Sequence, residues 1–189
     1  MTTSLKADQD RNLVLIGYRA TGKTAVGARL AQILNRPFVD LDQILVQEAG
    51  RAITEIVARH GWEDFRRREK ELVARFGARS GQVLATGGGA VLDPENVRVL
   101  RDHGVVIWLT AAPEVIQSRL AQDQPVDDSR PSLTGGDTIR EVEEVLKVRQ
   151  PLYRAAAQIT VETTGLTIPE VVDRVLAALQ HQEEALIGR

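Results

Sequence analysis

Hydrophobic residues form short unbroken runs along this chain, separated by longer segments with the spacing of an amphipathic helix. The run from Leu13 to Ile16 ends at Gly17 and predicts a strand that is buried on both faces. Residues 23–34 repeat their apolar positions at helical spacing and predict a helix. The same patterns predict further strands at 38–39, 82–85, 105–109 and 159–161, and further helices at 41–48, 53–59 (ended by His60-Gly61), 62–75, 113–120, 137–157 and 168–179. Strands that alternate with helices favour right-handed crossovers and a parallel sheet covered on both faces.

Proline and polar residues mark boundaries within this pattern. Asp93 and Pro94 are typical of a helix start, with aspartate as the N-cap and proline in the first turn. Pro151 lies inside the predicted helix 137–157 and is expected to end it or to kink it. The segment 121–136 is polar, contains prolines and glycines, and has no apolar stripe. We interpret it as a mobile loop.

Length and charge limit the class of protein. A chain of 189 residues predicts one domain, with a core over about 12–180 and flexible tails at 1–10 and 181–189. The net charge of -2 offers no basic face for a nucleic acid. The polar N-terminus lacks the core of a signal peptide, and no segment approaches the roughly 20 apolar residues of a membrane span. The absence of cysteine excludes disulfides. We therefore expect a cytoplasmic protein without nucleic-acid or membrane partners.

The segment Gly17 to Thr24 fits the spacing G-x-x-x-x-G-K-[ST] of a phosphate-binding loop. Its backbone N–H groups can point at phosphate oxygens, and the helix that follows turns its positive end to the anion. Lys23 can reach the outer phosphates, and the Thr24 hydroxyl can bind Mg²⁺. Ala20 stands where many such loops carry glycine, which narrows the loop's dihedral angles but removes no donor. The motif predicts a nucleoside triphosphate site.

Two acidic residues close the second predicted strand. Asp40 and Asp42 are spaced by two residues, so along a strand they point the same way. One could serve the metal and the other an acceptor hydroxyl; alternatively, either could only cap the next helix. The third strand runs into Thr86 and glycines and offers no carboxylate. The metal partner of Thr24 is therefore expected to be Asp40.

Three further features suggest a site for a second substrate. The glycines 87–89 follow a strand, where parallel sheets carry their ligand crevice, although a flexible turn is the simpler interpretation. Arg66 and Glu69 are three residues apart on a helix, so the carboxylate could hold the guanidinium group. Arg149 precedes a proline. Taken singly, both arginines could equally belong to solvated helix faces.

The motifs taken together resemble those of the shikimate kinases, a family in the nucleoside-monophosphate-kinase-like group of P-loop enzymes. The pieces that carry the resemblance stand in family order over about 12–180: GYRATGKTAVG, FVDLD, AITEI followed by GWEDFRRRE, TGGGAV, SRPSL and RQPLYR. The resemblance implies a three-layer αβα fold with a five-stranded parallel sheet, and it implies that 121–136 is a lid.

Residue roles follow from the same resemblance. It implies that Asp42 contacts the hydroxyls of shikimate and that Arg66 and Arg149 hold its carboxylate. Gly88 and Gly89 match glycines that approach this substrate. The residues expected at ATP are Ala20, Thr21, Gly22, Lys23, Thr24, Ala25, Arg119 near the adenine, and the lid residue Arg130. Those expected at Mg²⁺ are Thr24 and Asp40, and those expected in catalysis are Lys23, Asp42 and Arg130.

The implied reaction is ATP-dependent phosphorylation of shikimate to shikimate 3-phosphate and ADP, on the pathway to chorismate and the aromatic amino acids. Mg²⁺ is the implied cofactor, ATP and shikimate are the partners, and a compact kinase of this size is expected to be a monomer. A gluconate kinase of the same group is an alternative, because gluconate also has a carboxylate and hydroxyls. A regulatory ATP-binding protein without an acceptor is another alternative.

Overall fold

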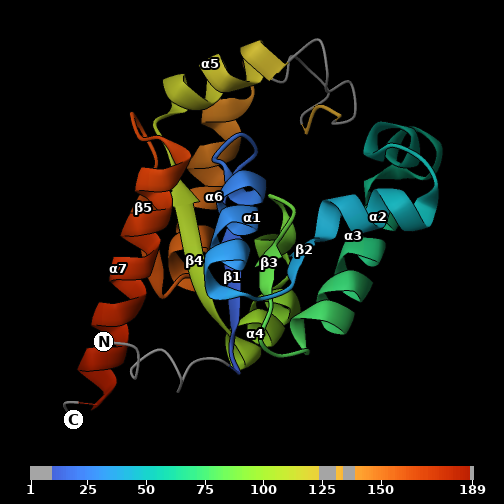
Figure 1. Cartoon of the computed structure of the whole chain (residues 1–189). Coiled ribbons are helices and arrows are strands. Elements are labelled where there is room, and N and C mark those ends of the chain that lie inside the picture. The colour runs from blue at the N-terminus through green and yellow to red at the C-terminus, as the bar shows by residue number, and fades with distance from the viewer. Residues whose placement is uncertain (1–9, 124–130, 134–138, 188–189) are drawn as a thin grey trace.

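The protein is built on a parallel sheet of five strands in the order β2-β3-β1-β4-β5. The computed structural model describes residues 10–123, 131–133 and 139–187. Its strands are β1 (Asn12–Ile16), β2 (Phe38–Asp40), β3 (Val83–Ala85), β4 (Gly104–Thr110) and β5 (Ile159–Glu162). The predicted five-stranded parallel sheet is confirmed, with β1 at its centre (Figure 1).

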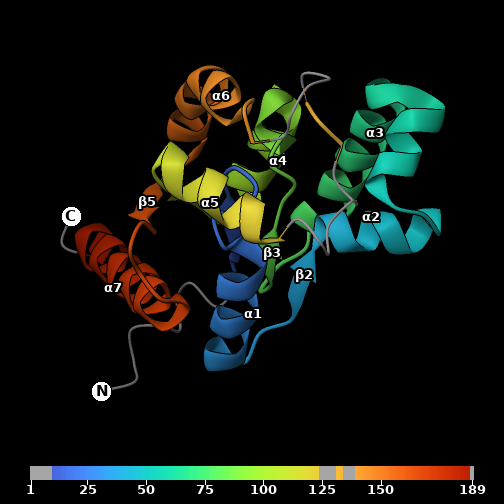
Figure 2. The same cartoon turned by 90° about the horizontal axis from the view of Figure 1, so that it is seen from above.

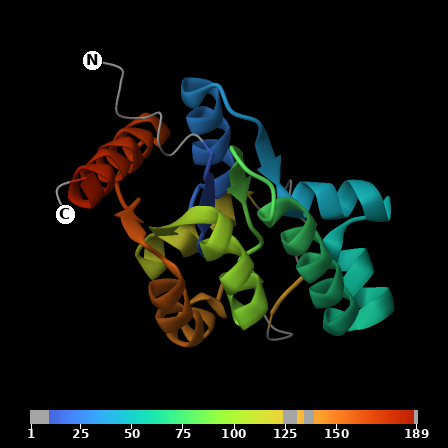
Figure 3. The ribbon, with the colours of Figure 1, turned by 90° about the horizontal axis from the view of Figure 1, so that it is seen from below.

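Helices cover both faces of this sheet. They are α1 (Lys23–Leu34), α2 (Leu41–Ala49), α3 (Ile53–Gly77), α4 (Pro94–His103), α5 (Pro113–Asp123), α6 (Val142–Ala156) and α7 (Ile168–Ile187), with a short 3₁₀ helix η2 (Ala90–Leu92). Figure 2 shows α1 and α7 on one side of the sheet and α3, α4 and α6 on the other. Figure 3 shows the same three layers from below. No helix of the described residues is both long enough and apolar enough to cross a membrane.

The residues of β1 divide between two hydrophobic cores because successive strand side chains point to opposite faces. Leu13 and Leu15 pack in the core that lies under α1 and α7. Val14 and Ile16 pack in the core on the other face, with side chains from α2, α3, α4 and α6. All four are at most 2% exposed. The continuous apolar run at 13–16 is therefore explained by burial on both faces, as its pattern predicts.

Several predicted boundaries hold. α3 contains a residue with non-helical backbone angles, Gly61, at φ 77° and ψ 171°, so the predicted break between 53–59 and 62–75 is confirmed. Asp93 is the N-cap of α4 and accepts a hydrogen bond from Glu95 N at 2.8 Å, and Pro94 occupies the first turn. Local side-chain chemistry is sufficient to set these boundaries.

The helix predicted at 137–157 is shorter than expected and is not ended by its proline. α6 begins at Val142, and Pro151 lies inside it. A proline in a helix removes one backbone hydrogen bond. Here the helix continues to Ala156 because Tyr153 and Ala156 are buried in the core on that face of the sheet.

The predicted loop and tails differ in part from the structure. Residues 121–123 belong to α5. Residues 124–130, which include Arg130, and 134–138 lie outside the described residues, as do 1–9 and 188–189. Residues 181–187 form the last turns of α7 and not a frayed tail, because glutamine, glutamate, alanine and leucine in this stretch favour helix.

Candidate active site

The phosphate-binding loop leaves the carboxyl end of β1 and enters α1. Gly17 has φ 141°, and a Cβ atom at this position would lie 2.3 Å from the carbonyl oxygen of Leu109, so glycine is required. Gly22 is the N-cap of α1 at φ 92°. Ala20 has φ 58°, a left-handed conformation that costs an L-residue roughly 1–2 kcal/mol. The loop therefore keeps the backbone form that glycine would favour at Ala20, and its N–H donor remains.

Lys23 folds back over the loop. Its Nζ donates hydrogen bonds to the carbonyl oxygens of Gly17, at 2.9 Å, and Tyr18, at 2.8 Å. Thr21 is 1% exposed, and its hydroxyl donates to the same Tyr18 carbonyl at 2.8 Å. The lysine ammonium group thus lies at the mouth of the loop, where phosphate oxygens would be bound.

Thr24 and Asp40 meet across the start of α1 and the end of β2. Thr24 Oγ1 donates to Asp40 Oδ2 at 2.7 Å, while Asp40 Oδ1 accepts from the backbone N of Asp42 and Gln43 at the start of α2. Asp40 therefore caps the helix and holds the loop threonine at the same time. A hydroxyl and a carboxylate oxygen are ligands that suit Mg²⁺, which takes few protein groups beside phosphates and water. The oxygen atoms of Thr24 and Asp40 are therefore suitable ligands for the expected Mg²⁺ ion.

Asp42 and Glu69 approach each other over Gly87. Asp42 lies in the first turn of α2 and not on the strand, so its orientation toward the pocket comes from the helix and not from strand alternation. A Cβ atom on Gly87 would lie 2.5 Å from Glu69 Oε1 and 2.8 Å from Asp42 Oδ1. The first of the three glycines is therefore needed to make room for two carboxylates, which the interpretation as a flexible turn does not explain.

Glu69 holds Arg66, as their spacing predicts. Arg66 Nη1 donates to Glu69 Oε2 at 2.5 Å, and its guanidinium carbon lies 5.4 Å from the ring centroid of Trp62. Burial raises the pKa of the Glu69 carboxyl above its usual value, against the opposing effect of Arg66. Among the described residues Glu69 Oε1 has no hydrogen-bond partner. A Cβ atom on Gly89 would lie 2.1 Å from Arg66 Nη1, so this glycine admits the guanidinium group.

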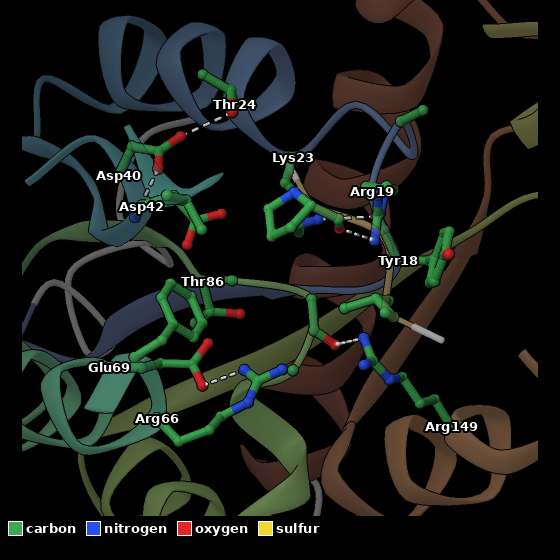
Figure 4. A pocket seen from close by; sticks show the side chains of 18 of the residues that line it. Tyr18, Arg19, Lys23, Thr24, Asp40, Asp42, Arg66, Glu69, Thr86 and Arg149 are labelled. Carbon is green, nitrogen blue, oxygen red and sulfur yellow. Dashed lines mark hydrogen bonds and ion pairs between the residues drawn. The ribbon is translucent and has the colours of Figure 1, made fainter. Parts of the chain in front are cut away.

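Arg149 contacts Gly88, the second of the three glycines. Its side chain comes from α6, is 7% exposed as a residue, and donates from Nη1 to the carbonyl oxygen of Gly88 at 3.2 Å. Tyr153 Oη donates to the same oxygen at 2.5 Å, and burial raises the pKa of Tyr153 to about 12. Figure 4 shows Arg66 and Arg149 coming from opposite sides of the view. By their contacts with Gly89 and Gly88 they both reach the turn formed by residues 87–89, the glycine turn.

These side chains line one cavity of about 290 Å³. Among its lining residues are most of those predicted from the sequence: Ala20, Gly22, Lys23, Thr24, Ala25, Asp40, Asp42, Arg66, Gly88, Gly89 and Arg149. Thr24, Asp40 and Asp42 lie together on one side of it, and the two arginines lie below them in the view of Figure 4. The cavity therefore brings together a phosphate-binding loop, an aspartate and a pair of guanidinium groups.

Arg119 lies in a neighbouring hollow with the other predicted loop residue, Thr21. Its Nη1 donates to the carbonyl oxygen of Ala20 at 3.1 Å, and its Nη2 donates to that of Thr163 at 3.0 Å. Ala20 and Gly22 of the phosphate-binding loop line both this hollow and the cavity described above. Its position beside the loop suits a base attached to the bound phosphates.

The sequence alone did not single out several lining residues, including Trp62, Phe65 and Thr86. On α3, Trp62 lies four residues before Arg66 and Phe65 lies four residues before Glu69, so helical spacing places each of them next to one member of this ion pair. Arg19 and Glu141 form a buried ion pair at 3.1 Å beside the cavity. No spacing rule connects two residues so far apart in the sequence.

Several known proteins resemble this chain in amino-acid sequence and in structure. A family model described as shikimate kinase matches residues 19–180. The shikimate kinase of Syntrophus aciditrophicus is 44% identical over 183 residues, covering 93% of this chain and 94% of the relative. That of Symbiobacterium thermophilum is also 44% identical, covering 92% and 98%. A solved shikimate kinase from Acinetobacter baumannii, in complex with shikimate, superimposes with a TM-score of 0.86 at 31% identity, covering 95% of this chain and 98% of the other. By its sequence and its fold, this chain belongs to the shikimate kinase family.

Proposed function

We propose that this protein transfers the γ-phosphoryl group of ATP to a hydroxyl of shikimate, giving shikimate 3-phosphate and ADP. One observation carries this assignment: a single cavity joins the phosphate-binding loop, Asp42 and the arginine pair. The acceptor of the solved relative is shikimate, a molecule with one carboxylate and several hydroxyls. Two guanidinium groups and one carboxylate complement it in charge.

Arg66 and Arg149 bind the carboxylate of the acceptor. A planar guanidinium group can bind both oxygens of a carboxylate, which a lysine cannot do. Their contacts with the glycine turn support this role, and so does the ion pair that orients Arg66 on Glu69. Binding of the carboxylate fixes the ring of the acceptor in the cavity that Asp42 also lines, so that one of the hydroxyls can face Asp42.

Asp42 accepts the proton of the attacking hydroxyl. The hydroxyl oxygen forms a bond to the γ-phosphorus, the bond from that phosphorus to the bridging oxygen of ADP breaks, and ADP leaves. Such transfer depends on position and charge more than on covalent chemistry. Lys23 and the loop N–H groups bind the phosphates, and Thr24 with Asp40 would hold Mg²⁺, which neutralises phosphate charge when it is bound.

Other parts of the site stay predictions. Arg130, expected to contact the transferred phosphoryl group, lies outside the described residues. Arg119 is proposed at the adenine on the basis of its hollow beside the loop. The monomeric state and the cytoplasmic location expected from the sequence also stay predictions.

An acceptor panel tests the function. Purified protein with ATP and Mg²⁺ is assayed for ADP with shikimate, with gluconate and with no acceptor. We expect rapid ADP formation with shikimate alone, because the family model and the relatives that match this chain are shikimate kinases. ADP formation with gluconate but not with shikimate would identify the related small-molecule kinase. Equal ADP release in all three samples would identify a regulatory ATPase.

A further inference from the structure

The cavity wall at Pro131 and Leu133 is tied to the phosphate-binding loop through a buried carboxylate. Glu141, directly before α6, is 2% exposed. Its Oε2 accepts hydrogen bonds from Ser132 Oγ at 2.7 Å and from Leu133 N at 2.8 Å. Its Oε1 accepts one from Arg19 Nη2 at 3.1 Å. One carboxylate therefore joins a loop residue to the segment that closes one side of the cavity.

Arg19 is also held on the loop side. Its guanidinium carbon lies 5.5 Å from the ring centroid of Tyr18, and its Nη2 lies 3.4 Å from the carbonyl oxygen of Pro131, to which it donates. Tyr18 is 1% exposed and packs with Ile116 of α5 and Val142 of α6. The first two residues after Gly17 therefore face α5, α6 and the residue that precedes α6. Figure 4 shows Tyr18 and Arg19 on the side of the cavity away from the two aspartates.

We propose that Glu141 is a positioning residue. Through its bonds to Arg19, Ser132 and Leu133 it holds the cavity wall formed by residues 131–133 at a fixed position relative to the phosphate-binding loop. The inference rests on the proposed function, because the wall faces the acceptor and the loop binds the donor. Glu141 does not line the cavity, so it acts on the reaction through the residues that it holds. It also fixes the place of Pro131, to which the predicted catalytic residue Arg130 is covalently bonded.

The size of the expected effect follows from how steeply transfer depends on position. A misplacement of about 1 Å at an active site can cost on the order of 10²-fold in rate. Loss of Glu141 removes the acceptor of two hydrogen bonds from the wall and one ion-pair partner of Arg19. If the ion pair were purely structural, its loss would lower the thermal stability and leave the kinetics of the folded enzyme unchanged. If Glu141 positions the wall, its loss raises the KM for shikimate or lowers kcat in the folded enzyme.

The kinetic test compares three alanine variants of the full chain with ATP and Mg²⁺. Glu141→Ala removes the anchor, Ser132→Ala removes one of its hydrogen bonds and keeps the ion pair, and Glu143→Ala makes the same exchange at an exposed site on α6. We expect kcat/KM for shikimate to fall about 10- to 100-fold in Glu141→Ala and several-fold in Ser132→Ala. Glu143→Ala should stay within about twofold of the wild type.

A second readout does not depend on turnover. The amide of Leu133 donates to Glu141, so its hydrogen exchange should become faster in Glu141→Ala, while amides in α1 keep their protection. If the wild type fails to phosphorylate shikimate, the proposed function is wrong, and this exchange measurement still tests the anchor. If Glu141→Ala does not fold, Ser132→Ala decides alone. Unchanged shikimate kinetics in the folded variants, or unchanged exchange at Leu133, would overturn the inference.

Discussion

Asp40 shows that a helix cap can also contact the phosphate-binding loop, so its two expected roles are compatible, and its role at the metal stays a prediction. Its Oδ1 caps α2 and its Oδ2 binds the hydroxyl of Thr24. From residue types alone, Asp40 could be predicted as a helix cap or as a metal ligand, because each role requires only an acidic residue at the end of a strand. The distance of 2.7 Å to Thr24 depends on the spatial order of the strands, which no local pattern contains.

The glycine turn at residues 87–89 also shows what the sequence could and could not predict about single residues. The sequence placed the glycines 87–89 at a ligand crevice, and the family resemblance implied that Gly88 and Gly89 approach the substrate. In the structure a Cβ atom at Gly87 or Gly89 would collide with the side chains of Asp42, Glu69 or Arg66. These side chains come from α2 and α3, which both lie between β2 and β3 in the chain. The requirement for glycine could thus be recognised from the sequence, but its cause could not.

Asp42→Asn is the substitution that isolates the chemistry at this scale. The amide keeps the shape of the carboxylate but loses its ability to accept a proton, so kcat should fall by about 10²- to 10⁴-fold. Nucleotide affinity should change little, because Asp42 is not part of the phosphate-binding loop. Steady-state kinetics and titration with a nucleotide measure the two effects.

The matched control is Asp102→Asn, the same exchange at an exposed aspartate of α4. It should leave both quantities at the level of the wild type. Turnover of Asp42→Asn close to that of the wild type would remove Asp42 from its proton-accepting role.

At the scale of elements, the sequence predicted strands and helix starts better than helix ends. Buried strands such as β1 and β4 are continuous apolar runs, and the start of α4 has its own cap. The start of α6 was placed too early: the helix begins at Val142, and its N-cap residue Glu141 makes no side-chain capping hydrogen bond that a local pattern could reveal. Of the two effects expected of Pro151, an end of the helix is excluded, because tertiary packing outweighs one lost helix bond. Boundaries set by local chemistry were predictable, and those set by distant contacts were not.

The bend in α3 allows a test of an element's shape. Gly61 has φ 77° and ψ 171°, a region essentially restricted to glycine, and a non-glycine residue held there costs roughly 1–3 kcal/mol. Gly61→Ala should therefore lower the free energy of unfolding by about that amount, measured by urea denaturation. It should also weaken shikimate binding, because Trp62 and Arg66 follow the bend.

The exposed residue Ala58, in the first part of the same helix, provides the reference. Ala58→Gly should cost at most about 1 kcal/mol, through helix propensity alone. If Gly61→Ala were as stable as the wild type, the bend would not be needed in the folded state.

At the scale of the whole molecule, the parallel sheet brings the parts of the site to one edge. The phosphate-binding loop follows β1, Asp40 ends β2, and the glycine turn follows β3. Ligands of open parallel sheets bind at the carboxyl ends of the strands, so this gathering could be expected from alternating strands and helices. The convergence of Arg66 from α3 and Arg149 from α6 could not be derived from spacing. It needed either the family resemblance or the structure.

Transfer of labelled phosphate tests the central claim most directly. The purified protein is incubated with Mg²⁺, shikimate and ATP labelled in its γ-phosphate, and the label is followed in shikimate phosphate and in free phosphate. The proposed site predicts that the label appears in shikimate phosphate, with one labelled product for each ADP formed. Label that appears in free phosphate at the same rate with and without shikimate would contradict it.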